Sequence, residues 1–352
     1  MNTRRATISD VARAAGVSPS TASVVFSGKT AVSDATRQRV LDAASDLGYT
    51  GPDPRAASLR LGRSGIVAVV VGSSLNLIFR DPVQRLMMDG LAEAVAPLGA
   101  GLLLLRAPSD VENAPTLMTA PIDAAVLIGC DGPLRASLDT AHARGLPIVV
   151  IEGDAGAGVP RVMLDNREAQ RAAAEHVRDL GHTRVAIVAL RISLGVDGGW
   201  IGADADITID VTRDRLLGAR DVFPDAPALA TTGSSIDAGL AAGRELFADP
   251  AQRPTAVIAQ SDLLGAGIVR AAEEAGLRVP EDVSVTGFDG IPVDGLAPYE
   301  LTTLVQAATE KGRAAGAAIA AMLDGLEPAS LLLTCPLRIG NTTGPAPSTP
   351  VD

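Results

Sequence analysis

Residues 6–50 read ATISDVARAAGVSPSTASVVFSGKTAVSDATRQRVLDAASDLGYT, and this stretch decides the fold of the N-terminal part of the chain. Thr7 and Asp10 have the three-residue spacing of a capping box, in which two side chains cap the start of a helix. Gly16 is placed to end that helix. Its apolar residues recur at the helical period and define one buried face: Ile8, Val11, Ala12 and Ala15.

Two further helices are predicted from the same stretch. Ser18 is an N-cap and Pro19 suits the first helical position, so a second helix runs to about Ser27. Ser33 starts a third helix and Gly48 ends it. The predicted buried stripe of this third helix consists of Val40, Leu41, Ala44 and Leu47. A plain helical bundle is the alternative, but two short helices joined by a tight glycine-containing turn are typical of a helix-turn-helix.

On these residues the chain resembles the family of the lactose and galactose repressors (LacI/GalR), and the resemblance continues through nearly the whole chain. It implies that the second helix enters the major groove of DNA and that Ala22 and Val25 face the core. Val24 stands where many relatives carry a long polar residue, so we expect it to contact a thymine methyl group and to leave more specificity to DNA shape. The predicted DNA-binding residues of the head are Pro19, Ser20 and Val24 at base edges, Thr21, Ser23 and Ser27 at phosphates, and Thr7 and Ser18 at the helix starts.

Residues 51–63 are predicted to be a hinge. Asp53 and Pro54 suit a helix start and Gly62 suits its end, but about eight residues make only a marginal helix in water. A solvated linker is the alternative from composition alone. The resemblance implies instead that hinge helices from two subunits pair and insert a leucine into the minor groove, and Leu59 occupies that place. The predicted DNA-binding residues of the hinge are Arg55, Ala56, Leu59 and Arg60.

Charge is distributed unevenly along the 352 residues. Residues 1–63 carry nine basic and five acidic side chains, a net charge of +4, and the whole chain carries −11, so the remainder carries −15. A basic head on an acidic body suits a protein that presents one face to phosphates.

Other features of the composition narrow the class of protein. No segment reaches about 18 uncharged apolar residues and no apolar run follows the N-terminus, so we expect a cytoplasmic protein that does not enter a membrane. Cys130 and Cys335 lie in apolar contexts and are expected to be buried free thiols. None of the three histidines has zinc-ligand spacing, so we expect neither a metal nor a cofactor.

From Gly65 onward, short β-branched runs alternate with amphipathic stretches, which predicts repeated βαβ units. We therefore predict an α/β body over residues 64–340, built of two Rossmann-like parallel-sheet lobes like a type I periplasmic-binding protein. Ligands of such sheets bind beyond the carboxyl ends of the strands, so the cleft between the lobes is the expected site. The predicted boundaries are about 64–160 plus 306–325 for the N-lobe, about 161–305 plus 326–340 for the C-lobe, and 341–352 for a disordered tail.

Several polar residues follow the predicted strands of the body. The resemblance implies that Arg215 is the family's effector-binding arginine, with Gly218 anchoring the alignment. Helix capping or loop hydrogen bonding is the alternative role for Asp165, Asp262 and Gln306. Because hydrogen-bonding groups dominate and aromatics are few, we expect a sugar or a related polyol or nucleoside. The predicted effector-binding residues are Asp81, Asp165, Arg215, Ser261, Asp262, Asp289 and Gln306.

Together these features predict a ligand-responsive repressor, without enzymatic activity, that binds double-stranded operator DNA as a homodimer or tetramer. Both an inducer and a corepressor fit the sequence. A solute-binding receptor is the first alternative, which the head and the lack of a signal peptide disfavour. A dinucleotide-dependent enzyme is the second, prompted by Gly265 and Gly267, but the third glycine of that motif is missing. Trp200, in a long Gly- and Asp-rich segment, covers either the cleft or a core.

Overall fold

In the computed structural model, the described residues are 6–27, 32–51, 62–72, 75–107, 115–129 and 132–348. The chain forms two compact units, Met1–Gly65 and Ile66–Asp352, each with its own core. The predicted hinge helix lies outside the described residues, together with Arg55, Ala56, Leu59, Arg60 and Cys130. Among the described residues, no helix combines the length and the apolarity needed to cross a membrane.

The N-terminal unit contains the three expected helices, α1 (Ile8–Ala15), α2 (Pro19–Ser27) and α3 (Asp34–Asp46). The predicted capping box is confirmed, because the Thr7 and Asp10 side chains each accept a hydrogen bond from the other residue's backbone N–H. The Ser18 side chain accepts from the N–H of Thr21, which confirms its place as N-cap. The buried core of the head is Val11, Ala12, Ala15, Ala22, Val25, Val40, Ala43 and Ala44.

The predicted buried stripe of α3 is partly wrong. Leu41 and Leu47 are 39% and 41% exposed, and Ala43 is buried instead. The buried face of α3 is formed by small residues because α3 packs closely on α1, and Leu47 stands at the helix end, where less of the bundle covers it. Leucine spacing alone did not show which side of α3 faces the other helices.

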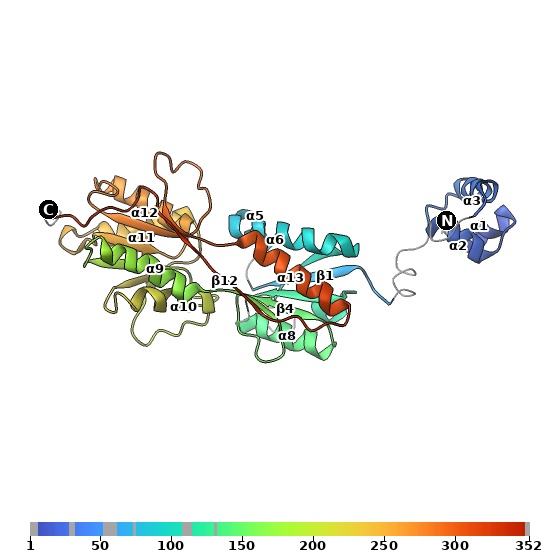
Figure 1. Cartoon of the computed structure of the whole chain (residues 1–352), viewed down its shortest axis with the longest axis horizontal. Helices are drawn as coiled ribbons and strands as arrows, with labels where there is room; N and C mark the ends of the chain where they lie inside the picture. The colour runs from blue at the N-terminus through green and yellow to red at the C-terminus, as the bar shows by residue number, and fades with distance from the viewer. Residues whose placement is uncertain are drawn as a thin grey trace. The chain divides into compact units, whose positions relative to one another are not determined.

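The N-lobe of the body is a parallel sheet with the strand order β12-β5-β4-β3-β1-β2. Its strands are β1 (Ile66–Val71), β2 (Gly101–Arg106), β3 (Ala124–Ile128), β4 (Ile148–Ile151), β5 (Arg161–Leu164) and β12 (Leu331–Leu333). Helices α6 (Pro82–Val95) and α13 (Ala308–Leu323) lie side by side on one face, and α8 (Gly132–Ala143) lies on the other (Figure 1). Shorter helices are α5 (Leu75–Arg80), η1 (Ala96–Leu98) and α7 (Pro115–Thr119). Both faces are covered, which is why β1 is apolar throughout.

The C-lobe is a sheet of order β13-β11-β10-β9-β6-β8-β7, parallel except for its two edge strands. Its strands are β6 (Val185–Ala189), β7 (Gly199–Trp200), β8 (Ala228–Ala230), β9 (Ala256–Ala259), β10 (Ser284–Asp289), β11 (Thr302–Val305) and β13 (Leu337–Arg338). Helices α9 (Asn166–Asp179) and α10 (Asp210–Arg220) cover one face, while α11 (Ile236–Phe247) and α12 (Asp262–Glu274) cover the other (Figure 1). The short helix η3 (Pro250–Gln252) follows α11.

The predicted lobe boundaries need two corrections. Strands β5 and β12, which the predicted boundaries place in the C-lobe, belong to the N-lobe sheet, where β12 pairs with β5 and β5 pairs with β4. The chain therefore crosses between the lobes after β5, after β11 and after β12. The residue pattern predicts that β5 and β12 are strands. Which sheet they join depends on the strands with which they pair, and β12 pairs with a strand far away in the sequence.

The predicted disorder of the C-terminal tail is also wrong for residues 341–346. Thr342 is fully buried, where its hydroxyl donates to the carbonyl of Val285 and accepts from the N–H of Thr302. The N–H of Ala346 donates to the carbonyl of Leu180. A polar composition favours disorder only when the polar groups find no buried partners, and here strands β10 and β11 supply partners for Thr342.

Glycines let three pairs of helices pack at very short range. A Cβ on Gly218 of α10 would lie 2.1 Å from the carbonyl oxygen of Arg167 on α9, and a Cβ on Gly312 of α13 would lie 2.0 Å from that of Met87 on α6. Gly267 of α12 faces α11 in the same way, with its Cβ position 2.2 Å from the carbonyl oxygen of Ile236. Gly267, which prompted the dinucleotide alternative, therefore serves helix packing.

Candidate functional site

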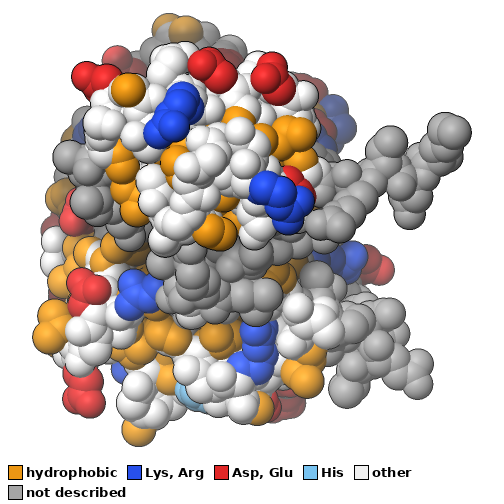
Figure 2. Space-filling view, turned by 90° about the vertical axis from the view of Figure 1, so that its right-hand side faces the viewer, with side chains coloured by type: hydrophobic (Ala, Val, Ile, Leu, Met, Phe, Trp, Pro, Cys, Tyr) orange, Lys and Arg blue, Asp and Glu red, His pale blue; other side chains and the backbone are white. Residues whose placement is uncertain are grey.

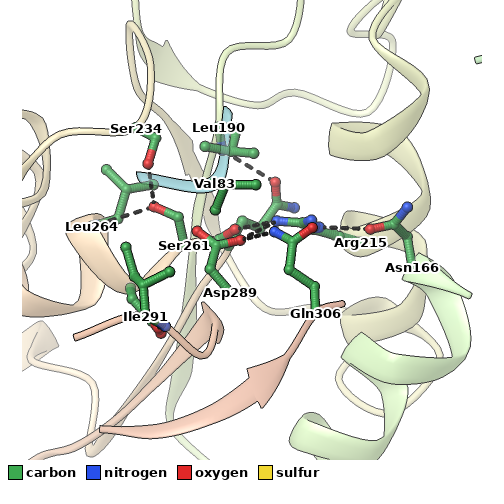
Figure 3. A network of polar contacts seen from close by, with 12 residues as sticks. Val83, Asn166, Leu190, Arg215, Ser234, Ser261, Leu264, Asp289, Ile291 and Gln306 are labelled. Atoms are coloured by element: carbon green, nitrogen blue, oxygen red, sulfur yellow. Dashed lines mark hydrogen bonds and ion pairs between the residues drawn. The ribbon is translucent and has the colours of Figure 1, made fainter. Parts of the chain in front are cut away.

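Six side chains form a closed ring of polar contacts where the two lobes meet. Most of them follow strand ends, as expected for sheets of this kind. The ring contains two carboxylates, two cations and two carboxamides: Glu152, Asp289, Arg215, Lys311, Asn166 and Gln306. Figure 3 shows Arg215 reaching between Asn166 on one side and the Asp289–Gln306 pair on the other.

The N-lobe contributes an ion pair to the ring. Lys311, on α13, places Nζ 3.0 Å from Oε1 of Glu152, which directly follows β4. Lys311 is only 4% exposed. A lysine is rarely buried this far without a partner, so the pair must stay together to avoid leaving an uncompensated charge.

The C-lobe contributes the second pair of charges. Nη1 of Arg215 lies 3.8 Å from Oδ1 of Asp289 and donates to the carbonyl of Gln260 at 2.6 Å. The Arg215 guanidinium also lies 3.4 Å above the ring centre of Phe288. Gly218 makes this placement possible, because its close approach to α9 brings the preceding turn of α10, with Arg215, toward the crossover.

The two carboxamides lie on two of the segments that cross between the lobes, and each joins a charge of one lobe to a charge of the other. Asn166 accepts from Nε of Arg215 at 2.9 Å and donates to Glu152 at 2.9 Å. Gln306 donates to Asp289 at 2.5 Å and accepts from Lys311 at 2.6 Å. A change in the angle between the lobes therefore has to alter these amide contacts.

Strain and desolvation concentrate in the ring. Glu152 and Asp289, with φ of 56° and 124°, are the non-glycine residues of positive φ in the described part of the chain. Such backbone conformations cost about 1–3 kcal/mol each and cluster at functional sites. Burial raises the pKa of Asp289 to about 8, although Arg215 acts in the opposite direction, and burial lowers the pKa of Arg215.

Asp81 faces the same ring from the N-lobe. Its carboxylate caps α6 by accepting from the N–H groups of Val83 at 2.9 Å and Gln84 at 3.3 Å. Burial raises the pKa of Asp81, while these hydrogen bonds and the nearby cations Lys311 and Arg215 act to lower it. Asp81 thus adds a third carboxylate around two cations.

The structure places the remaining predicted effector residues differently. Asp262 is fully buried and its carboxylate accepts from Thr303 and from the N–H of Ile291, so it holds the loop after β10. Burial raises the pKa of Asp262 to about 6. Ser261 caps α12 and accepts from the Ser234 hydroxyl. Asp165 is half-buried and accepts from the N–H of Cys335, which joins two crossover segments.

Sequence reasoning brought together Asp81, Arg215, Asp289 and Gln306, but it missed the other three members of the ring. Glu152 and Asn166 had a usable signal, because each comes just after a short apolar run that forms a strand, β4 or β5. Lys311 had none, because a lysine inside an amphipathic helix is normally solvated.

In the head, the residues predicted to read DNA are divided between exposed and partly buried positions. Pro19 and Ser20 are exposed at the start of α2, and Val24 is half-buried one turn later. Ala22 and Val25 are buried, as predicted. The hydroxyl of Ser18 lies 2.8 Å from those of both Ser20 and Thr21, so the start of α2 presents a cluster of hydroxyl groups.

The structure describes only some of the basic side chains of the head. Figure 2 shows a face on which the coloured Lys and Arg side chains are scattered among apolar and uncharged ones. Of the nine basic residues in positions 1–63, the structure describes Arg13, Arg37, Arg39 and Arg63. The others lie within residues 1–5, 28–31 and 52–61, outside the described residues.

Known proteins resemble both parts of the chain. Residues 7–51 match the family described as bacterial regulatory proteins, lacI family, and residues 174–343 match the periplasmic binding protein-like domain. An HTH-type transcriptional regulator of Mycobacterium tuberculosis is 34% identical over 97% of this chain and 98% of its own. The HTH-type transcriptional regulator CelR of Thermobifida fusca is 32% identical over 96% of this chain and 98% of its own.

Solved structures agree in fold. A lac repressor dimer bound to operator superposes with a TM-score of 0.78 at 22% identity and covers 97% of this chain and 100% of that chain. A CelR–cellobiose complex superposes with a TM-score of 0.66 at 28% identity and covers 96% of this chain and 100% of that chain.

A helix-turn-helix head joined to a two-lobed body with a polar site between the lobes defines a ligand-responsive, DNA-binding transcriptional regulator. The chain belongs to the LacI family of bacterial regulatory proteins. The relatives compared here are transcriptional regulators, which agrees with the expectation of a non-enzymatic role and disfavours the two alternative classes.

Proposed function

We propose that this regulator is a repressor whose operator affinity is set by an uncharged, polyhydroxylated ligand bound at the ring between the lobes. The observation that supports this ligand class is the charge of the site: three carboxylates, of Asp81, Glu152 and Asp289, surround the two cations Arg215 and Lys311. A phosphorylated or acidic ligand would find both cations already beside a carboxyl group, Lys311 with Glu152 and Arg215 with Asp289, so neither is left to pair with its charge. Hydroxyl groups can both donate and accept, which suits this mixed set.

A bound ligand would compete with contacts that the ring makes with itself. Its hydroxyl groups would replace the amide contacts of Asn166 and Gln306, which lie on the crossover segments. Such a replacement changes the preferred angle between the lobes. We propose that this change moves the start of the body, near Ile66, and thereby the spacing of two hinges in a homodimer.

The relatives support the ligand class. A CelR structure is described as a complex with cellobiose, and a LacI family regulator of Enterococcus faecium is described with bound ribose. We propose by this likeness that the present chain also takes a sugar or related polyol, acts in the cytoplasm and binds operator DNA as a homodimer.

The test combines thermal shift with operator binding. A panel of neutral sugars, polyols and nucleosides is compared with phosphorylated sugars and amino acids, and a stabilising ligand is then added during selection of bound DNA from a random library. We expect stabilisation by a neutral polyol and a change in operator affinity on adding it, whose sign distinguishes an inducer from a corepressor. Stabilisation only by charged ligands, or a stabilising polyol that leaves DNA binding unchanged, would contradict the proposal.

A further inference from the structure

A cavity lies in the C-lobe, and no member of the ring lines it. It has a volume of about 710 Å³, within the range of small-molecule sites. Its walls include the residues before or at the starts of β6, β8 and β9, namely Arg184, Pro227 and Pro254. Because these strands are parallel and the ring lies beyond their carboxyl ends, the cavity opens at the opposite edge of the sheet.

Trp200, the one tryptophan of the chain, forms part of this cavity. It lies on β7, a two-residue edge strand that pairs antiparallel with β8 on an otherwise parallel region of the sheet. The side chain remains 53% exposed, so Trp200 covers neither the interlobe site nor a core. Phe223 lines the same cavity, which gives it two of the eight aromatic residues in the sequence.

The electrostatics of the cavity favour a cation. Three carboxylates line it, those of Asp225, Glu245 and Asp249, against the single guanidinium of Arg184. Asp249 is partly engaged in capping η3, whereas among the described residues the side chains of Asp225 and Glu245 form no hydrogen bond or ion pair. Two carboxylates are therefore free to meet a ligand.

Two helices also end at this cavity. Residues directly beyond the end of α10 and the last turn of α11 form part of its wall. Helix C-termini carry partial negative charge, which attracts cations. The carbonyl of Phe247 already accepts from Nε of Arg253, so part of the α11 terminus is satisfied. The aromatic face of Trp200 adds a further preference for a cation.

From this arrangement we propose that the C-lobe has a second ligand site, separate from the interlobe ring, which binds a small organic cation. An ammonium group lies against Trp200 between Asp225 and Glu245, and its apolar substituents contact Phe223 and Leu246. The site does not depend on the function proposed for the ring.

The single tryptophan provides the assay. The full chain is titrated with choline and, separately, with 3,3-dimethylbutan-1-ol, which has the same shape without the charge, while Trp200 emission is recorded. We expect a saturable change with choline and a dissociation constant about tenfold higher for the neutral alcohol, because the cation–π and ion-pair contributions are lost. Equal affinities, or the absence of a saturable change, would overturn the proposal.

Three variants assign the response to the cavity. Combined Asp225→Asn and Glu245→Gln substitutions should weaken choline binding about tenfold, since both carboxylates lose their charge. Combined Asp324→Asn and Glu327→Gln substitutions remove two exposed carboxylates elsewhere and should change nothing. Gln306→Ala, in the ring, should leave choline binding intact, and a loss of binding there would place choline in the interlobe site instead.

Two other occupants of the cavity would give different results in this assay. An arginine-rich peptide that changes Trp200 emission when choline does not would indicate a protein partner and overturn the small-molecule proposal. If Trp200 emission changes with protein concentration but not with choline, a second copy of the chain covers the cavity. That result would also overturn the small-molecule proposal.

Discussion

Lys311 of the N-lobe is joined to Asp289 of the C-lobe through a single side chain, the carboxamide of Gln306. Gln306 accepts from Nζ of Lys311 at 2.6 Å and donates to Oδ1 of Asp289 at 2.5 Å. Both side chains are buried, with Lys311 4% and Asp289 7% exposed. This link makes the segment that crosses between the lobes before α13 sensitive to any ligand that competes for Lys311 or Asp289.

Gln306→Ala should therefore weaken the connection between the lobes. The free energy of unfolding of the body should fall by roughly 1–3 kcal/mol, because two buried charged groups each lose a hydrogen bond. Urea denaturation of the full chain measures this. Gln252→Ala, which removes an exposed amide of the body that donates to Asp249, is the matched control and should cost much less. An equal loss in the two variants would contradict a special role for Gln306.

Arg215→Lys should separate ligand binding from DNA binding. Lysine keeps the charge but loses the planar geometry with which Arg215 contacts Asn166 and Gln260 and stacks on Phe288. We expect ligand affinity to fall by more than about tenfold, since both the hydrogen-bond geometry and the stacking are lost. Operator affinity without ligand should remain near that of the parent. Calorimetry and operator binding test the two halves, and an unchanged ligand affinity would remove Arg215 from the site.

Asp289→Asn should change how stability depends on pH. The pKa of Asp289 rises from 3.8 to about 8 because it is buried, so the folded chain favours its protonated form. The resulting stability is fully present below the ordinary pKa and is lost as pH rises toward and through about 8. Between pH 5 and pH 9, the parent should lose more stability than the isosteric asparagine variant. Parallel pH dependences in denaturant unfolding would show that Asp289 does not titrate in this way.

Deleting residues 341–352 should destabilise the body, whereas deleting only 349–352 should not. The longer deletion removes Thr342 and leaves the N–H of Thr302 and the carbonyl of Val285 without their partner. We expect a loss of about 2–4 kcal/mol, the sum of a few buried hydrogen bonds. Denaturant unfolding of both deletions gives the comparison, and equal stabilities would mean that the tail contributes little.

The deletion of residues 341–352 should also change how the stability of the body depends on pH. Burial lowers the pKa of His182, whose ring contacts Thr255, Ser284 and the carbonyl of Gly344 on the tail. A lowered histidine pKa contributes stability that is present above the ordinary value near 6.5 and is lost as pH falls below it. The carbonyl of Gly344 acts to raise this pKa, but burial is the larger effect, so exposing the His182 ring by the longer deletion should shrink the stability difference between the two deletions from pH 8 to pH 5.

Val24→Arg should alter base preference in the operator. Val24 is half-buried and lies one turn after the exposed Pro19 and Ser20 on α2. A long side chain at position 24 would therefore extend from the same helix as these two residues. Arginine adds the donors that recognise guanine, where valine offers only a methyl contact. Selection from a randomised operator library should gain a guanine at one position of each half-site. The same preferences at every position would show that residue 24 does not read bases.

The sequence by itself determined the local elements. The caps at Thr7, Ser18 and Ser33 depend on contacts across three residues, so their pattern is complete within a short stretch. The strands and helices of the body follow from periodicity, which is also local. The family resemblance directed attention to Arg215 and Asp289, which both lie in the ring, but not to Glu152, Asn166 or Lys311.

Tertiary structure decided everything that depends on distant pairing. Glu152 and Lys311 are 159 residues apart in the sequence. They meet because Glu152 follows the end of β4 and Lys311 lies in the first turn of α13, which packs on the same sheet. Strands β5 and β12 joined the N-lobe, and the Thr-rich tail became buried, because hydrogen-bond partners were supplied by segments far away in the chain. Periodicity and capping depend only on residues close together in the sequence, so these patterns predict neither the ring nor the Trp200 cavity. Both follow from the order in which the strands assemble.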